Sequence, residues 1–229
     1  MEHKMSNTEN LLELRNICFS VDQQIIIDNL SLTLQPNEFK VITGPSGCGK
    51  STLLKIIASL FPPSSGDIFL HEKNIITIKP EEYRQKVSYC FQTPVLFGET
   101  VSDNLRFPYQ IRGDKVDNEK IKKGLLQFDL PLHILDKKID ELSGGEKQRV
   151  ALLRNLQYQP EILLLDEITS ALDDKNKEIV HQVIDDLINS SGIAVLWVTH
   201  NSDEIRQSHN LLRMEKHEAK GEEQWANII

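Results

Sequence analysis

The sequence contains no long hydrophobic run. Its longest uninterrupted apolar stretches, such as residues 162–165 and 193–198, are far shorter than the roughly 20 residues that a helix needs to cross a bilayer. The first ten residues are polar and include Glu2 and Glu9, so they lack the apolar core of a secretory signal. We therefore expect a chain that stays in the cytoplasm and cannot form a membrane channel by itself.

Cysteine is also scarce, and the 34 acidic residues outnumber the 26 Lys and Arg residues. The three cysteines, Cys18, Cys48 and Cys90, are scattered through 229 residues, so we expect free thiols, as is usual in a cytosolic chain. A formal net charge of -8 weighs against a nucleic-acid partner, because binding to a phosphate backbone depends on clustered Lys and Arg. The overall composition is typical of a globular protein. We expect a flexible tail over residues 1–10 and a single domain over residues 11–229.

Strand and helix signals alternate along most of the chain. Two β-rich stretches, residues 11–19 and 25–34, flank a polar turn and predict an N-terminal hairpin. Residues 94–158 show no strand signal, so we expect a helical segment there. Elsewhere the alternation predicts an α/β fold with a mostly parallel sheet. The expected strands are 40–43, 67–70, 87–91, 162–165, 194–198 and 210–214, and the expected helices are 50–60, 175–189 and 202–207.

The first motif that carries chemistry lies between an expected strand and an expected helix. Residues 44–51 fit the pattern G-x-x-x-x-G-K-[ST], in which the backbone N–H groups surround a phosphate and Ser51 offers a hydroxyl to Mg²⁺. The helix that follows directs its positive dipole end at the anion, and Lys50 adds a full charge. The motif predicts a phosphate-binding loop made of Gly44, Pro45, Ser46, Gly47, Cys48, Gly49, Lys50, Ser51 and Thr52.

The second motif ends an apolar strand with two carboxylates. Residues 162–165 read Ile-Leu-Leu-Leu and are followed by Asp166 and Glu167. In α/β sheets, ligands bind at the carboxyl ends of the strands. One carboxylate in that place can hold Mg²⁺ through its water shell, and a second one can deprotonate an attacking water. We assign the first role to Asp166 and the second to Glu167.

These two motifs alone would suit a kinase or a helicase equally well. A third motif, Leu-Ser-Gly-Gly-Glu-Lys-Gln-Arg over residues 142–149, narrows the choice. Ser143 can cap a helix there, and the two glycines expose the N–H groups of the first turn. A single site has no evident use for a second phosphate-binding helix end. This motivates the hypothesis that Ser143, Gly144 and Gly145 complete the site of another copy.

The motifs and their order closely resemble those of the ABC transporter ATPase family, from about residue 11 to about residue 214. The resemblance implies a P-loop NTPase core, an N-terminal antiparallel β subdomain and a helical signature subdomain over about residues 94–158. It implies that Gln92 contacts Mg²⁺ or the lytic water and that His200 senses the γ-phosphate of ATP. It assigns residues 44–52 to Walker A, residues 142–146 to the signature, residues 162–167 to Walker B and residues 170–173 to the D-loop.

Three positions depart from the pattern of the family. Val21 lies where many members carry an aromatic residue that stacks on adenine. Unless Phe19 substitutes, the lost stacking is worth on the order of 1–3 kcal/mol of ATP affinity. Glu146 stands where glutamine is commonest in the signature, and Ile168 stands where proline usually follows the Walker B glutamate. Neither change removes a catalytic group.

The resemblance implies an ATPase that uses ATP and Mg²⁺ and forms a head-to-tail homodimer in the ATP-bound state. It implies a peripheral position on the cytoplasmic face of the bacterial inner membrane, where the subunit would power a separate integral permease. No nucleic-acid partner is expected.

Two segments point to a narrower group within the family. Residues 88–98 and 166–173 resemble those of the ATPase subunit of a bacterial system implicated in iron export. Because the histidines and cysteines show no paired metal-ligand spacing, we expect the membrane subunit to recognise the cargo. The alternatives are a transporter of another substrate, a non-transport ABC ATPase that acts on nucleic acid or ribosomes, and a small-molecule kinase.

Overall fold

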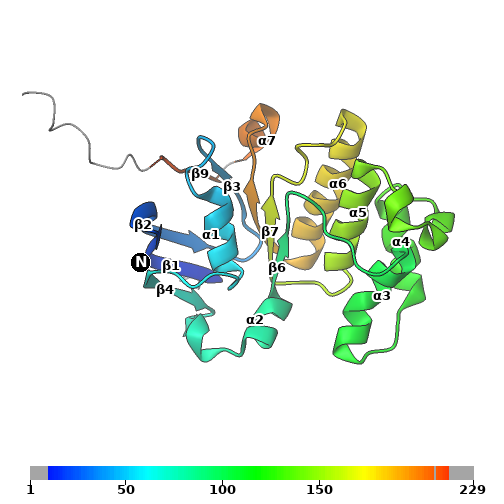
Figure 1. Cartoon of the computed structure of the whole chain (residues 1–229), viewed down its shortest axis with the longest axis horizontal. Helices are drawn as coiled ribbons and strands as arrows, with labels where there is room; N and C mark the ends of the chain where they lie inside the picture. Colours follow the sequence, from blue (N-terminus) through cyan, green and yellow to red (C-terminus); the bar gives the residue numbers. More distant parts are fainter. Residues whose placement is uncertain (1–9, 209, 217–229) are drawn as a thin grey trace, which may run out of the picture.

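The chain folds around two β-sheets, which Figure 1 shows side by side. This computed structural model describes residues 10–208 and 210–216. Most of the predicted tail, residues 1–9, therefore lies outside the described residues.

The first sheet is antiparallel and confirms the predicted N-terminal hairpin. Its strands are β1 (Leu12–Val21), β2 (Gln24–Leu34), β4 (Ser65–Leu70) and β5 (Lys73–Asn74), in the order β2-β1-β4-β5. The turn between β1 and β2 consists of Asp22 and Gln23, which both have positive φ. Two such residues are what a two-residue type I′ hairpin turn requires.

The second sheet is entirely parallel, as the alternation of strands and helices predicts. It consists of β3 (Phe39–Thr43), β6 (Val87–Cys90), β7 (Ile162–Asp166), β8 (Ala194–Val198) and β9 (Asn210–Arg213). The strand order is β6-β7-β8-β3-β9, and every pairing is parallel. All carboxyl ends of these strands therefore meet at one edge of the sheet, where the two catalytic motifs were predicted to lie.

Helices cover both faces of the parallel sheet. The α-helices are α1 (Lys50–Ile57), α2 (Pro80–Lys86), α3 (Val101–Arg112), α4 (Asn118–Gln127), α5 (Gly144–Asn155), α6 (Asp174–Ser191) and α7 (Ser202–Gln207), and short 3-10 helices span Ile75–Thr77, Leu132–Asp136 and Ile139–Glu141. No helix within residues 10–208 and 210–216 has the length and apolar character needed to span a membrane.

Two helices differ from the sequence prediction. The helix that we predicted over residues 50–60 ends at Ile57, because Ser59 adopts a left-handed conformation with φ 56. The prediction contained no helix at α2. That short helix buries only Tyr83, so its sequence has no apolar periodicity, although Pro80 at its first turn is a helix-start signal.

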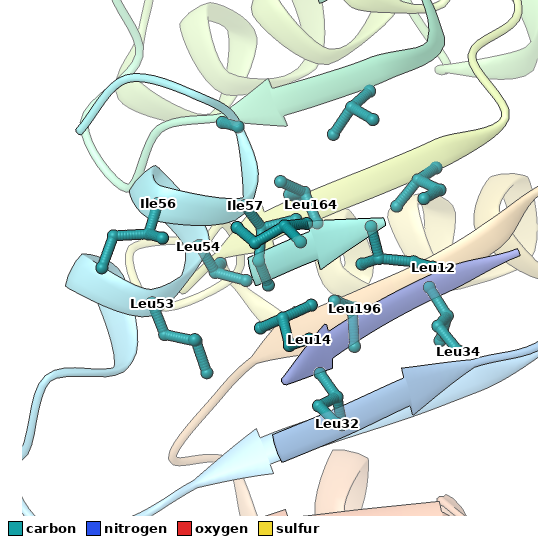
Figure 2. Close-up of a cluster of buried hydrophobic side chains, with 14 of the residues drawn as sticks. Leu12, Leu14, Leu32, Leu34, Leu53, Leu54, Ile56, Ile57, Leu164 and Leu196 are labelled. Atoms are coloured by element: carbon teal, nitrogen blue, oxygen red, sulfur yellow. The ribbon is translucent and has the colours of Figure 1, made fainter. Parts of the chain in front are cut away.

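The parallel sheet separates two hydrophobic clusters. Alternate residues of β7 point to opposite faces, so Leu164 packs with α1 and the antiparallel sheet, whereas Leu163 packs with α3, α5 and α6. Figure 2 shows the first cluster, in which side chains of α1 lie beside side chains of β1, β2, β7 and β8. The segment with α3, α4 and α5 lies on the side of the parallel sheet away from the antiparallel sheet (Figure 1).

Truncation of the central strand tests this packing. Leu164 is fully buried in the first cluster, so Leu164→Ala should lower the free energy of unfolding by about 2–5 kcal/mol. Leu126 is 67% exposed on α4, and Leu126→Ala should change it by less than about 0.5 kcal/mol. Urea unfolding of both variants measures the difference. Equal losses in the two variants would contradict the buried position of Leu164.

Candidate active site

The phosphate-binding loop connects β3 to α1 at the carboxyl edge of the parallel sheet. Two of its glycines are required by geometry. Gly49 caps α1 with φ 96, a left-handed conformation that side chains disfavour. A Cβ on Gly44 would lie 2.2 Å from the carbonyl oxygen of Met214, just after β9. The loop is therefore packed against the end of the neighbouring strand, and its N–H groups are presented on the other side.

Lys50 holds this loop from within. Its ammonium group donates hydrogen bonds to the carbonyl oxygens of Gly44 (2.9 Å) and Pro45 (3.1 Å). The side chain is buried, so these bonds offset the loss of solvation of the charge. An ammonium group has three donors, and the third contact of Lys50 is a long one of 4.0 Å to Cys48 Sγ. A phosphate oxygen can replace this weak acceptor while the other two hydrogen bonds still stabilise the loop.

Asp166 lies at the end of β7, behind the loop. Its side chain is 3% exposed, and both of its oxygens accept hydrogen bonds. Ser51 donates to Oδ1 at 2.8 Å, and the hydroxyl of Tyr89 on β6 donates to Oδ2 at 2.6 Å. The structure thus brings two of the three predicted metal ligands, Ser51 and Asp166, into direct contact; the third, Gln92, contacts Glu167 instead.

The predicted base, Glu167, lies between Gln92 and His200. Gln92 Nε2 donates to Glu167 Oε2 at 2.9 Å, and His200 Nε2 lies 3.0 Å from Glu167 Oε1. Glu167 itself has φ 48, a conformation that costs a non-glycine residue energy and that occurs often at functional sites. The N–H of Glu167 donates to the carbonyl oxygen of Val198 on β8, and the N–H of Ser170 donates to the carbonyl oxygen of Glu167. These two hydrogen bonds hold the strained turn in place.

A cleft of about 760 Å³ opens over these groups. It lies between the phosphate-binding loop on one side and Gln92, Glu167 and His200 on the other. Its full lining is Gln24, Ile26, Pro45, Ser46, Gly47, Gly49, Lys50, Ser51, Thr52, Gln92, Glu167 and His200. Ten of these twelve residues, all except Gln24 and Ile26, were predicted as site residues, and they therefore face one space. Gly44, Cys48 and Asp166 lie behind this lining, where they support the loop and the metal ligands.

The wall of the cleft toward the antiparallel sheet differs from the predicted one. Val21 is 47% exposed and is not among the residues that line the cleft. Phe19 stacks on Phe61 with 6.1 Å between the ring centroids, so its ring is engaged elsewhere. Gln24 and Ile26 of β2 line the cleft instead. The only sequence signal for these two residues was their position on a strand that borders the loop.

The third motif forms the start of α5, as predicted. Ser143 Oγ accepts a hydrogen bond from the N–H of Glu146, and Glu146 Oε2 accepts one from the N–H of Ser143 at 2.7 Å. Burial raises the pKa of Glu146, but the hydrogen bonds donated by Ser143 and Lys137 outweigh it and hold the pKa below its usual range. Glu146 therefore closes a capping box, which explains why glutamate is tolerated there. Ser143 and Gly144 are exposed, and no described residue of α5 lines the cleft.

Comparison with known proteins agrees with this geometry. A protein-family model described as ABC transporter matches residues 27–170. The chain is 51% identical to the probable iron export ATP-binding protein FetA of Escherichia coli K12, over 96% of this chain and 97% of that protein. The chain belongs to the ABC transporter family.

More distant ABC relatives share the cassette within larger or dimeric assemblies. The chain is 40% identical to the spermidine/putrescine import ATP-binding protein PotA of Mycoplasma capricolum over 85% of its length, and it spans only 56% of that protein. It also superposes, with a TM-score of 0.79 and 29% identity, on a dimeric ATP-binding cassette in a post-hydrolysis state bound to ADP and Pi, over 90% of this chain and 97% of that one. The chain is an ABC ATPase cassette, and both the predicted family and the predicted fold class are confirmed.

The sequence did not predict the role of one buried carboxyl group in this ABC cassette, that of Glu204. Glu204 on α7 is 2% exposed and joins the loops that follow β7 and β8. Its carboxylate accepts hydrogen bonds from Thr169, at 2.7 Å, and from Thr199, and His181 Nε2 lies 2.9 Å from Oε1. Thr169 lies two residues after Glu167, and Thr199 directly precedes His200. Glutamates on short surface helices are common, so the sequence carried no signal for this role.

The charge of Glu204 is stabilised by these donors. Burial raises the pKa of the carboxyl group, but the hydrogen bonds from His181, Thr199 and Thr169 outweigh burial and hold the pKa below its usual value of 4.5. A folded-state pKa below the unfolded one means that the ionised group stabilises the fold above about pH 4.5 and loses this effect as the pH falls through the folded pKa.

Glu204→Gln tests this network. The amide removes charge-assisted hydrogen bonds from a buried group, so the variant should be less stable than the parent by about 1–3 kcal/mol at about pH 7. The difference should shrink as the pH falls below about 4.5 and through the lower folded-state pKa of Glu204, where the folded parent becomes protonated. Thermal unfolding across this pH range measures it, with the exposed Glu178→Gln on α6 as the control. A deficit that stays constant down to about pH 3 would contradict the role of the charge.

Proposed function

We propose that this chain is the ATP-hydrolysing subunit of an ABC transporter and that its cargo is iron, which it helps to export. The observation that carries the ATPase mechanism is the position of Glu167. Its carboxylate lies at the cleft between Gln92 and His200, across from the phosphate-binding loop. The cargo is proposed on the 51% identity to FetA.

Each side chain has a proposed role in hydrolysis. Lys50 and the N–H groups of its loop bind the phosphates of ATP. Glu167 accepts a proton from the attacking water as the oxygen of that water bonds to the γ-phosphorus, and ADP leaves. Gln92 orients the water, and His200 donates a hydrogen bond to the charge that develops on the γ-phosphoryl oxygens. In the structure Gln92 and His200 instead contact Glu167, which keeps the three groups together at the cleft.

The donor set at the foot of the cleft suits Mg²⁺. Ser51 Oγ and Asp166 Oδ1 are hard oxygen ligands only 2.8 Å apart, and Mg²⁺ is usually held by one or two protein oxygens together with substrate phosphates and water. Ser51 and Asp166 would hold the ion, with Gln92 beside them. When bound, Mg²⁺ neutralises charge on the β- and γ-phosphate oxygens.

We propose that two copies pair head to tail in the ATP-bound state. The start of α5 has N–H groups without intrahelical acceptors, and Ser143 and Gly144 are exposed away from the lining of the cleft of their own chain. In the pair, Ser143, Gly144 and Gly145 of one copy would contact the γ-phosphate held by the other copy. The similarity to a dimeric cassette supports this arrangement.

The remaining assignments concern the membrane. We propose a peripheral location on the cytoplasmic face of the bacterial inner membrane, with an integral permease as partner and the helical segment, about residues 94–158, as the part that transmits motion to it. The similarity to PotA, named for spermidine/putrescine import, keeps another cargo as the alternative. A non-transport ABC ATPase that acts on nucleic acid or ribosomes is a less favoured alternative.

Replacement of the base tests the mechanism. Glu167→Gln should leave ATP binding intact, should lower ATP turnover by at least about a hundredfold and should accumulate an ATP-bound dimer, because the pair reopens only after hydrolysis. Phosphate release and light scattering measure the two effects, with Glu81→Gln, an exposed position on α2, as the control. Turnover at the parent rate would refute the role of Glu167.

A second substitution in that background tests the pairing. Ser143→Arg combined with Glu167→Gln places a bulky side chain at the start of α5, so the protein should still bind ATP but remain monomeric. Ser190→Arg, at an exposed position on α6, should leave the dimer intact. A stable ATP-bound dimer of the Ser143 variant would exclude the proposed interface. Ser143→Arg alone, with Glu167 intact, should have lost ATPase activity, which a small-molecule kinase would not require.

Purification from membranes tests the partner and the cargo. The chain should co-purify with an integral membrane protein, and cells that lack it should retain radioactive iron longer, with rescue by the parent chain but not by Glu167→Gln. Retention of spermidine, measured in parallel, distinguishes iron from the alternative cargo. Recovery of ribosomes or DNA in place of a membrane subunit would reject the transporter assignment.

A further inference from the structure

The carboxylate of Asp166 is held by two hydroxyl groups from two different elements. Ser51 from the start of α1 donates to one oxygen, and Tyr89 from β6 donates to the other. The proposed mechanism uses Ser51 and Asp166 but gives Tyr89 no task. Tyr89 nevertheless makes the shorter of the two hydrogen bonds, 2.6 Å against 2.8 Å.

The sheet register explains how Tyr89 reaches this carboxylate. Tyr89 pairs with Leu164 across the parallel strands β6 and β7, and both side chains belong to the cluster that packs against α1. Asp166 follows Leu164 by two residues, so its side chain points to the same face. Tyr89 therefore lies on the neighbouring strand, level with the residue two positions before Asp166. Its ring points along this face of the sheet toward the site.

Contacts on both sides fix the tyrosine. Its carbonyl oxygen accepts a hydrogen bond of 3.0 Å from Asn155 at the end of α5, and its ring packs edge-on against Phe91, with 4.6 Å between centroids. The phenol hydroxyl has a single hydrogen, and it donates this hydrogen to Oδ2 of Asp166.

A neutral donor of this kind suits a carboxylate that must present its other oxygen to a cation. The phenol leaves the negative charge on Asp166, stops rotation of the carboxylate group and occupies only Oδ2. Outer groups that orient ligands in this way contribute strongly to metal affinity in other proteins. A phenylalanine at position 89 would keep the ring packing against Phe91 but would leave Oδ2 of a buried carboxylate without its donor.

We propose that Tyr89 is a positioning residue for the metal site: its hydroxyl orients Asp166 so that Oδ1 faces Ser51 and the bound cation. This inference rests on the proposed role of Asp166 as a metal ligand. It assigns Tyr89 a function that ring packing alone does not require, because the hydroxyl, not the ring, makes the contact.

Tyr89→Phe tests the inference with Mn²⁺ as the probe. The full chain is titrated with Mn²⁺ in the presence of a non-hydrolysable ATP analogue and followed by electron paramagnetic resonance. The affinity of the variant for Mn²⁺ should be about tenfold lower than that of the parent. Affinity for the analogue in EDTA should be unchanged. In ATPase assays the Mg²⁺ concentration for half-maximal rate should rise similarly, and the rate at saturating Mg²⁺ should approach that of the parent.

Two controls make the result decisive. Tyr83→Phe also removes a buried hydroxyl, which donates to the carbonyl oxygen of Ile57 at 2.6 Å away from the site, and it should leave Mn²⁺ affinity unchanged. Asp166→Asn should abolish Mn²⁺ binding. Parent-like affinity in Tyr89→Phe, or an equal loss in Tyr83→Phe, would overturn the inference while the proposed function stands. Normal binding in Asp166→Asn would instead overturn the proposed function.

Discussion

The hydrogen-bonded carboxylate of Asp166 is the interaction on which the rest of the site depends. It stands at the end of β7, a strand buried on both faces, so its charge is removed from bulk water and must be satisfied by protein donors. Ser51 supplies one donor from the phosphate-binding loop, and Tyr89 supplies the other from the strand that leads to Gln92. A single buried charge thus connects the loop that binds phosphate with the segment that carries Gln92.

The residues around this carboxylate are held at an energetic cost that the packed sheet offsets. Glu167 occupies a left-handed conformation, and the carboxylate of Glu204 is almost fully buried. Glu167 lies in the loop after β7, and Glu204 lies on α7, which follows the loop after β8. Both strands pack into hydrophobic clusters on both faces. The clusters fix the ends of β7 and β8. These strand ends then hold Glu167 Oε1 and His200 Nε2 3.0 Å apart. The packing of the core therefore maintains a conformation of the loops that they would not adopt by themselves.

The two helix starts that were predicted to bind phosphate differ in what surrounds them. The start of α1 opens into the cleft beside Gln92, Glu167 and His200, whereas the start of α5 is exposed and its N–H groups are capped only by its own capping box. The chain thus carries a cleft with the proposed catalytic groups in one wall and, separately, an exposed helix start that is proposed to bind an anion. That separation is the physical basis for the proposal that ATP is shared between two copies.

Residue type and spacing were enough to predict the local elements and the chemistry of the motifs. The apolar strand at residues 162–165, the loop between β3 and α1 and the cap at Ser143 were predicted in this way. Contacts between distant segments were decided only by the tertiary structure. The register of β6 against β7 brings Tyr89 to Asp166, and the packing of α7 brings Glu204 to Thr169 and Thr199. The tertiary structure also places Gln24 and Ile26 of β2, and not Val21, in the lining of the cleft. Such contacts depend on strand order and side-chain direction, which no local pattern encodes.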